Sequence, residues 1–266
     1  MLGKVLSIAG SDSGGGAGIQ ADLKTIQALG GFGMTALTAM TAQNTEGVTA
    51  VEGVSPDFVV EQIRVVMDDL GVDAIKVGML HSAAVINAVA DYLESLDNLP
   101  PIVVDPVMIA KGGANLLSED AEDAIMGRLL PKLTTLLTPN IPEAECLVGW
   151  KIETFEDREK AGRELLAKGP GAVLMKGGHA EGPVVTDLLV LPEGSLRFEH
   201  PRVSSRHTHG TGCTLSSAIA TGLAQGLPLD QAVERGLRYV EIAILEAPGY
   251  GRGHGPLHHG HTVRDF

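Results

Sequence analysis

The chain has 266 residues, of which 44% are hydrophobic and only 3% aromatic, so an aliphatic-cored α/β domain fits it better than an aromatic-rich all-β fold. Its formal charge of −13 leaves no basic surface for nucleic acid, and no apolar run approaches the ~18 residues that span a bilayer. The presence of only two cysteines favours a reducing, cytoplasmic setting, and the N-terminus is typical of a first strand and not of a signal peptide.

Short apolar runs that predict strands alternate along the chain with longer stretches of helical periodicity. The predicted strands cover residues 5–9, 35–41, 74–77, 102–105, 136–138 and 172–176. The predicted helices cover residues 20–29, 56–70, 83–96, 119–130, 155–168, 215–225 and 230–246. This alternation indicates βαβ units and a mostly parallel central sheet flanked by helices.

Residues 184–203 have a different pattern. Two strand-like runs flank the turn PEGS, which predicts an antiparallel hairpin at one edge of the sheet. No linker, repeat or low-complexity block interrupts the chain. We therefore predict one α/β domain over residues 1–266, with a C-terminal tail from about residue 250.

Glycine-rich and polar stretches follow several predicted strands, where ligands bind in open parallel sheets. The first of them ends in residues 16–21, GAGIQA, which match the dinucleotide fingerprint G-x-G-x-x-A. No Asp or Glu lies between Asp22 and Glu46, where that fold needs an acid for the ribose, so a dinucleotide site is disfavoured. A tight structural loop and close backbone approach to a small ligand are the alternatives, and no Walker A motif is present.

The stretch HGTGC, residues 209–213, precedes a predicted helix. Gly210 and Gly212 leave the backbone free to turn its amides toward one point, and Thr211 or Thr214 is expected to cap the helix. Free N–H groups and the positive end of the helix dipole together predict an anion hole. The alternative is an ordinary glycine-rich helix start. Cys213 stands at the junction.

Three further stretches at strand ends suit phosphate chemistry. Asp105 in DPVM is a hard oxygen ligand for Mg²⁺, and Asn140 and Glu143 in TPNIPE are spaced to face one site. Lys176 in MKGG places a cation beside two glycines, where it can meet a phosphate. Each residue alone has a structural alternative, as a cap, a solvated acid or a surface lysine. Together they predict a nucleotide–magnesium site.

In their order and spacing, these motifs resemble the hydroxymethylpyrimidine/phosphomethylpyrimidine kinases of thiamine synthesis, which belong to the ribokinase-like superfamily. The similar stretches are AGSDSGGGAGIQADLKT, TAQNT, KVGML, DPVM, LTPNIPEA, VLMKGGH and THGTGCTLSSAIA, and the likeness runs from about residue 4 to about residue 259. The resemblance implies a ribokinase-like fold, ATP and Mg²⁺ as cosubstrates, and a homodimer. It also implies two phosphorylations, of an aminopyrimidine alcohol and then of its monophosphate.

The resemblance also assigns roles to residues of this chain. It places the pyrimidine among Gly10, Asp22, Gln43, Met79 and Val107. It gives Mg²⁺ and its waters to Asp105, Asn140 and Glu143, and the ATP phosphates to Lys176. It forms the anion hole from Gly210, Thr211, Gly212 and Cys213. Residues 108–117 correspond to a flap, in which Lys111 is expected to reach the substrate phosphate in the second reaction.

Cys213 is expected beside the substrate hydroxyl, as its base or as a group that orients it. The helix N-terminus lowers the pKa of such a thiol, and the charge of ATP opposes that effect. Most other ribokinase-like enzymes have Asp at this position, which disfavours a sugar kinase. Pyridoxal kinases of the same group carry a second cysteine in the flap, where this chain has Ala110. A pyridoxal kinase and a non-catalytic ligand sensor are the alternatives.

The remaining chemistry-bearing residues have a structural interpretation. The C-terminal tail holds four histidines, for which packing or dimer contacts are favoured over a metal site: His254, His258, His259 and His261. His207 and His209 flank the anion hole, and His209 is expected to order that loop or to touch phosphate. Cys146 lies on the apolar face of EAECLVGW and is predicted to be part of the core.

Overall fold

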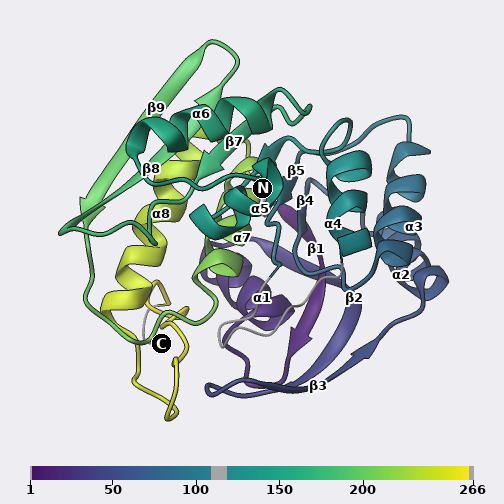
Figure 1. Cartoon of the computed structure of the whole chain (residues 1–266). Helices are drawn as coiled ribbons and strands as arrows, with labels where there is room; N and C mark the ends of the chain where they lie inside the picture. The colour runs from purple at the N-terminus through teal and green to yellow at the C-terminus, as the bar shows by residue number, and fades with distance from the viewer. Residues whose placement is uncertain (1, 109–118, 264–266) are drawn as a thin grey trace.

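The computed structural model describes residues 2–108 and 119–263 as one α/β domain built on a nine-stranded sheet (Figure 1). The strand order is β3-β2-β1-β4-β5-β6-β7-β8-β9. The strands are β1 (Lys4–Asp12), β2 (Phe32–Gln43), β3 (Val48–Gly53), β4 (Ala74–Val77), β5 (Ile102–Val104), β6 (Leu136–Leu137), β7 (Ala172–Met175), β8 (Val184–Leu191) and β9 (Gly194–Pro201).

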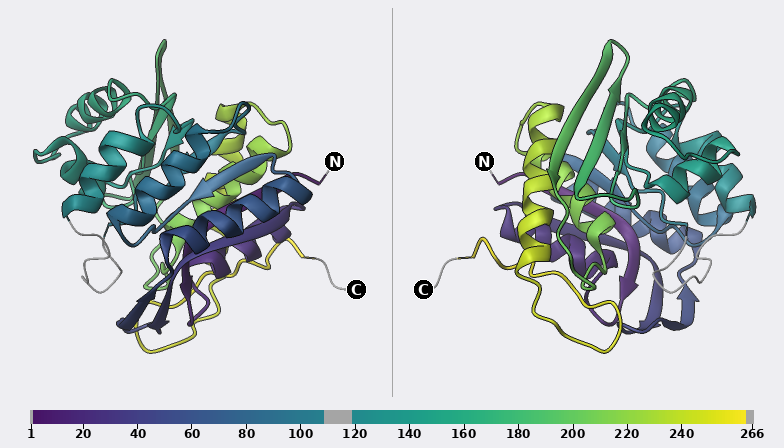
Figure 2. Two further views of the ribbon diagram at one scale, coloured as in Figure 1. Left: turned by 90° about the vertical axis from the view of Figure 1, so that its right-hand side faces the viewer. Right: turned by 60° about the vertical axis from the view of Figure 1, so that its left-hand side comes forward.

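Helices cover both faces of this sheet (Figures 1 and 2). They are α1 (Gly18–Ala28), α2 (Pro56–Asp69), α3 (Ala83–Glu94), α4 (Glu119–Ala124), α5 (Ile141–Val148), α6 (Phe155–Leu166), α7 (Thr211–Ala224) and α8 (Leu229–Leu245). A π-helical turn, Ile125–Leu129, follows α4. No helix in the described ranges has both the length and the apolarity to cross a membrane.

The central strands run parallel, as the alternating pattern predicted. β1, β2 and β4 to β7 pair in parallel, and the β8–β9 hairpin joins β7 in antiparallel fashion at one edge. Figure 2 shows this hairpin extending beyond the rest of the sheet. The prediction of an antiparallel edge hairpin is therefore confirmed. The opposite edge is also antiparallel, because β3 pairs with β2 in that direction. This edge strand was not predicted from the sequence.

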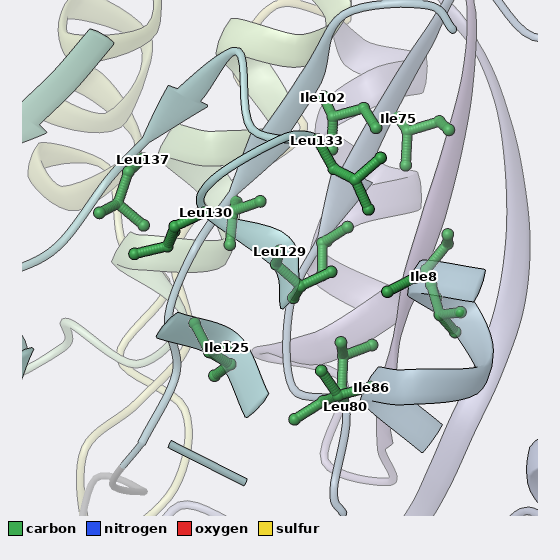
Figure 3. Close-up of a cluster of buried hydrophobic side chains, with 14 of the residues drawn as sticks. Ile8, Ile75, Leu80, Ile86, Ile102, Ile125, Leu129, Leu130, Leu133 and Leu137 are labelled. Carbon is green, nitrogen blue, oxygen red and sulfur yellow. The ribbon is translucent and has the colours of Figure 1, made fainter. Parts of the chain in front are cut away.

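Side chains of each central strand alternate between two hydrophobic cores. On β1, Val5 belongs to the core under α1, α7 and α8, whereas Leu6 and Ile8 belong to the larger core under α2 to α6. On β4, Ala74 and Ile75 divide in the same way. Figure 3 shows part of the larger core, with Ile8 and Ile75 among its aliphatic side chains. Strands buried on both faces explain the short, uninterrupted apolar runs of the sequence.

Candidate active site

A cavity of about 820 Å³ opens beyond the carboxyl ends of the parallel strands. It brings together nearly all the residues that the sequence assigned to a site: Gly10, Gln43, Met79, Asp105, Val107, Asn140, Glu143, Lys176, Gly210, Thr211, Gly212 and Cys213. Asp22 does not line the cavity, and the predicted flap from residue 109, with Lys111, lies outside the described residues.

The HGTGC turn begins α7 with an unusual cap. Gly210 is the N-cap residue in the left-handed conformation (φ 82°, ψ 10°), and no side chain caps the helix. A side chain at Gly210 would collide with the carbonyl oxygen of Gly16, so this turn and the first glycine-rich loop pack backbone to backbone. The prediction that Thr211 or Thr214 caps α7 is wrong. The Thr214 hydroxyl instead pairs with His259, 3.0 Å away.

Lys176, Asp105 and Glu143 form a buried charge cluster beside this helix start. Lys176 Nζ lies 2.8 Å from Asp105 Oδ1 and 3.7 Å from Glu143 Oε2, and Thr138 donates to Asp105 from 3.2 Å. A Cβ built on Gly212 would lie 3.0 Å from Asp105 Oδ2 and 3.3 Å from Lys176 Nζ. The absence of a side chain at Gly212 therefore lets the start of α7 and the charge cluster meet.

The charged side chains of this cluster shift one another's pKa values. Burial alone would lower the pKa of Lys176, but Asp105 and Glu143 outweigh it, so the pKa is raised and the ammonium is charged. Burial raises the pKa of Glu143 to about 7, helped by Asp105 and opposed by Lys176. Glu143 is therefore only partly ionised at neutral pH and gains charge most readily when another cation arrives.

Asn140 and Glu143 share a capping box at the start of α5. Asn140 Oδ1 accepts from the Glu143 amide at 2.9 Å, and Glu143 Oε2 accepts from the Asn140 amide at 2.8 Å. The spacing of three that suggested a shared site in the sequence is thus also that of a helix cap. Both residues line the cavity, so the cap holds them where a ligand can reach them.

Magnesium fits this donor set only if the ligand supplies further oxygens. Asp105 and Glu143 are carboxylates, which Mg²⁺ prefers. Across the described residues no three or more His, Cys, Asp and Glu side chains cluster as a metal site. Mg²⁺ commonly binds through one or two carboxylates together with phosphates and water, so these residues fit a cation that arrives with a nucleotide.

Cys213 is a partly buried thiol in the first turn of α7. Burial raises its pKa to about 11; Lys76 lowers it, while Asp22 and Asp105 raise it further. The lowering expected from the helix N-terminus is therefore outweighed by desolvation. At neutral pH the side chain is a neutral thiol that lines the cavity. It can orient a hydroxyl group but is a poor base.

Lys76 is a cavity residue that the sequence analysis missed. It lies in β4, fully buried, and its Nζ donates to both carboxylate oxygens of Asp22, at 2.9 and 2.8 Å. Ser7 and Ser217 also donate to Asp22, which stands behind the cavity wall. Burial would lower the pKa of Lys76, but Asp22 and Cys213 raise it more strongly. A single lysine within the apolar run AIKV was the available signal.

A second network joins the first glycine-rich loop to the HGTGC turn. Asp12 accepts from the amides of Gly14, Gly16 and Ala17, and His209 Nε2 lies 2.8 Å from Asp12 Oδ2. The expectation that His209 orders its loop is confirmed by this contact. A Cβ on Gly16 would lie 2.6 Å from the His209 ring, so only glycine allows the ring to lie there.

Gln43, Met79 and Gly10 line the cavity at the ends of β2, β4 and β1, whereas the charge cluster follows β5, β6 and β7 on the other side of the strand order. Gln43 Nε2 lies 3.3 Å from His209 Nε2, and its Oε1 lies 3.0 Å from Thr41 Oγ1. A side chain at Gly10 would collide with the Met79 methyl group, so the thioether covers the bare backbone. An amide edge beside an apolar surface suits a flat ring that carries hydrogen-bonding groups.

The far end of the cavity is formed by β8, β9 and α8, to which no sequence motif pointed. Asp187 accepts from the Gly177 amide at 2.7 Å and pairs with His200 at 3.2 Å, and this contact with Asp187 raises the pKa of His200. Apolar side chains of α7 and α8 complete this end: Leu215, Leu237, Val240 and Ile244. Their contribution comes from helix faces, which carry no local motif.

The predictions for Cys146 and for the tail histidines have different outcomes. Cys146 is exposed and lines the cavity, with its thiol 3.0 Å from Glu122, so the prediction of a core position is wrong. The packing prediction for the tail histidines is confirmed for His259, which is buried against Thr214 and whose carbonyl accepts from Tyr239, whereas His254 and His258 are exposed. The tail also reaches the loop after β2, where the His254 amide donates to the Thr45 carbonyl at 2.9 Å.

A glycine-rich helix start, a lysine–carboxylate cluster and an amide beside an apolar wall meet at the end of a mostly parallel sheet, the arrangement expected of a kinase of the ribokinase-like class. A family model described as phosphomethylpyrimidine kinase matches residues 12–258, and the chain belongs to that family. The resemblance noted in the sequence is confirmed.

Individual relatives agree with this assignment. The thiamine biosynthesis bifunctional protein ThiED of Geobacter sulfurreducens is 52% identical over 99% of this chain, which spans only 54% of that relative. The hydroxymethylpyrimidine/phosphomethylpyrimidine kinase of Bacillus subtilis is 45% identical over 96% of this chain and 94% of its own length.

Solved structures show the same fold. A phosphomethylpyrimidine kinase from Clostridium difficile 630 is 44% identical, with a TM-score of 0.80 over 91% of this chain and 99% of its own. A pyridoxal kinase from Staphylococcus aureus, in complex with AMP-PCP and pyridoxal, is 35% identical, with a TM-score of 0.89 over 98% of this chain and 94% of its own.

Proposed function

We propose that the chain transfers the γ-phosphoryl group of ATP to the hydroxymethyl group of 4-amino-5-hydroxymethyl-2-methylpyrimidine, and then phosphorylates the monophosphate to the diphosphate. One observation carries the proposal. Lys176, Asp105 and the HGTGC helix start meet at one point of a cavity that Gln43 and Met79 also line. The family membership and the names of its relatives support the same reaction.

The nucleotide lies in the half of the cavity formed by α7, α8 and the hairpin. The apolar side chains of Leu237, Val240 and Ile244 receive the adenine, and the phosphates run toward Lys176 and the N-terminus of α7. Amides and the lysine ammonium then surround the transferring group, where the transition state spreads negative charge over its oxygens.

The pyrimidine lies against the other wall. Gln43 offers one donor and one acceptor, which match the exocyclic amine and a neighbouring ring nitrogen. Met79 and Val107 give the ring apolar contacts on its faces. The hydroxymethyl group then points toward the start of α7, between Cys213 and the γ-phosphate.

Asp105 and Glu143 would hold Mg²⁺ together with phosphate oxygens, and Asn140 would organise its water shell. When bound, it neutralises phosphate charge. Since the pKa of Glu143 is about 7 in the free protein, a cation beside it favours ionisation. Lys176 then exchanges part of its contact with Asp105 for the incoming phosphates.

Cys213 acts in the first reaction by orienting the substrate hydroxyl. Its pKa of about 11 keeps the thiol protonated, so the hydroxyl proton passes late to an oxygen of the transferring phosphoryl group, as the bond from the hydroxyl oxygen to phosphorus forms and the bond from phosphorus to ADP breaks. In the second reaction, the attacking atom is an ionised phosphate oxygen that needs no base.

An ATP-consumption assay tests the proposal, run with and without the aminopyrimidine alcohol, and with ³¹P NMR to separate monophosphate from diphosphate. We expect stimulated turnover and both products in succession. Lys176→Met should abolish most turnover, whereas the matched variant Lys132→Met, at a 70% exposed site outside the cavity, should not. Absence of substrate-stimulated turnover would favour a non-catalytic ligand sensor.

Pyridoxal is the second candidate substrate, favoured by the TM-score of 0.89 to a pyridoxal kinase. Pyridoxal and ribose in the same assay rank the alternatives, and we expect the aminopyrimidine alcohol to give the highest kcat/KM. We further propose a homodimer in the reducing cytoplasm, which the solution mass and labelling of both thiols in freshly lysed cells would test.

A further inference from the structure

The amide of Gln43 has one orientation that satisfies its neighbours. Nitrogen and oxygen of a carboxamide are nearly equal in size, so the hydrogen-bond network decides which end faces which partner. The two partners are His209, 3.3 Å from one end, and Thr41, 3.0 Å from the other. Both partners are constrained by further contacts.

His209 can only donate at Nε2. Its partner Asp12 accepts three backbone N–H groups, and although burial alone would raise the pKa of Asp12, the bonds to His209 and Ala17 lower it. Asp12 is therefore an ionised carboxylate, which has no hydrogen to give. The short contact of 2.8 Å requires a hydrogen on His209 Nε2, whether or not the ring is charged.

Thr41 has a single hydroxyl hydrogen, and the Ser11 carbonyl takes it at 2.9 Å. Thr41 Oγ1 is then an acceptor toward Gln43. An amide with its nitrogen toward His209 would set two donors against each other and leave Thr41 short of a hydrogen. Turned by 180°, the same amide places its carbonyl beside His209 Nε2–H, whose hydrogen bonds mainly to Asp12 and is shared with Gln43, and its amino group against Thr41, so that no two donors face each other.

We infer that the Asp12–His209 pair holds the Gln43 amide in this orientation and thereby fixes the direction in which the substrate's hydroxymethyl group points. The inference rests on the proposed function for the identity of the substrate. With the carbonyl on the His209 side, the exocyclic amine of the pyrimidine must dock on that side too. The hydroxymethyl group is on the adjacent ring carbon, so it faces Gly210 and the anion hole, which follow His209 in the chain.

The opposite amide orientation would turn the ring over. The amine would then lie on the Thr41 side, and the hydroxymethyl group would face away from the start of α7. His209 is thus a positioning residue that acts through Gln43 and touches no reacting atom. A ligand with no amine beside its hydroxymethyl group is not oriented by the Gln43 carbonyl, so the His209 contact should not affect its kcat/KM.

The first experiment determines the His209 tautomer and the orientation of the Gln43 amide in the free protein. In ¹⁵N NMR of histidine-labelled protein, assigned by loss of the signal in His209→Gln, we expect a hydrogen on Nε2. Cross-peaks should connect the Gln43 side-chain amide protons to Thr41. An Nδ1–H tautomer with a bare Nε2, or amide cross-peaks to the His209 ring, would overturn the inference without bearing on the reaction.

The second experiment reads its consequence in kcat/KM for the aminopyrimidine alcohol and for its analogue without the exocyclic amine. In His209→Leu, we expect kcat/KM for the amino substrate to fall about tenfold and that for the analogue to change less than about twofold. His209→Gln keeps an N–H near the position of Nε2 and should restore most of the discrimination. The KM for ATP should stay within about twofold in both variants.

Equal losses for both ligands would mean that His209 only holds the loop together, and would overturn the inference. If the wild-type protein leaves the aminopyrimidine alcohol unphosphorylated, the proposed function fails instead. The NMR measurement still decides the amide orientation in that case, so the two failures are distinguishable.

Discussion

The ammonium group of Lys76 lies 2.9 and 2.8 Å from the two carboxylate oxygens of Asp22, and neither side chain has any exposed surface. The pair links β4 to α1, and Ser217 ties it to α7. Lys76 also borders the cavity, so this ion pair lies directly behind the wall of the site. Removal of either partner leaves the other charge buried alone, which is costly.

Lys76→Met should therefore lower the free energy of unfolding by about 3–5 kcal/mol in urea denaturation. The double variant Lys76→Met/Asp22→Asn should recover more than half of that loss, because Ser7 and Ser217 still serve a neutral side chain at position 22. A single variant within about 1 kcal/mol of the wild type would contradict the role of a buried ion pair.

The short central strands that the sequence predicted, such as β4 and β7, are buried on both faces. The run AIKV was predicted as residues 74–77 and forms β4 with the same bounds, since all four residues are buried. β3 was missed because its side chains are almost all exposed, so no apolar alternation marks it. α7 starts at Thr211, four residues before the predicted start. Gly212 has a low helix propensity, so the sequence of this first turn does not predict a helix.

The residues of the site also divide into those that the sequence predicted and those that it did not. Asp105, Lys176 and the HGTGC turn were predictable from the sequence. The carboxyl ends of parallel strands meet at one edge of the sheet, and this follows from the backbone topology alone. Asp12, Lys76 and the α8 side chains acquire their positions through partners distant in sequence, such as His209, 197 residues from Asp12. No local pattern records such a contact, so these members of the site became visible only in three dimensions.

The raised pKa of Cys213 makes its alkylation strongly pH-dependent. Burial is the main cause of the value of about 11, so the reactive thiolate forms only above neutral pH. In a Cys146→Ser background, iodoacetamide labelling should be slow at pH 7 and rise about tenfold per pH unit through pH 9. A plateau at or below pH 8.5 would contradict a desolvated thiol.

Cys213→Ala should slow the first phosphorylation more than the second. In the proposed reactions, the thiol orients a neutral hydroxyl in the first step, whereas an ionised phosphate attacks in the second. We expect kcat to fall about tenfold to hundredfold for the alcohol and less than about threefold for the monophosphate, measured separately with each substrate. Equal losses in both steps would show that the thiol only packs the helix start.

Gly210→Ala should disrupt the anion hole. Its φ of 82° is unfavourable for alanine, and the new Cβ would meet the Gly16 carbonyl, so the turn must shift. We expect at least about a hundredfold loss of kcat/KM, because small displacements of catalytic groups have large effects. Gly226→Ala is the matched control, since Gly226 has a φ of 84° with nothing near its Cβ position. That control should lose about 1 kcal/mol of stability and keep its activity.

The buried tail histidine should make the fold sensitive to acid. Burial lowers the pKa of His259 from 6.5 to about 4, with smaller contributions from Lys24 and the neighbouring histidines. Between these two values the unfolded chain binds more protons at this site than the folded chain. Stability should therefore be full above pH 6.5 and fall as the pH drops toward 4, as measured by urea unfolding across this range.

His259→Gln separates this effect from other acid-sensitive groups. The amide can still pair with Thr214 but does not titrate, so the variant should lose less stability than the wild type between pH 6.5 and pH 4.5. Burial also lowers the pKa of His261, so the double variant with His261→Gln should have the flattest profile. Parallel profiles for the wild type and both variants would show that these histidines are not the buried titrating groups of the tail.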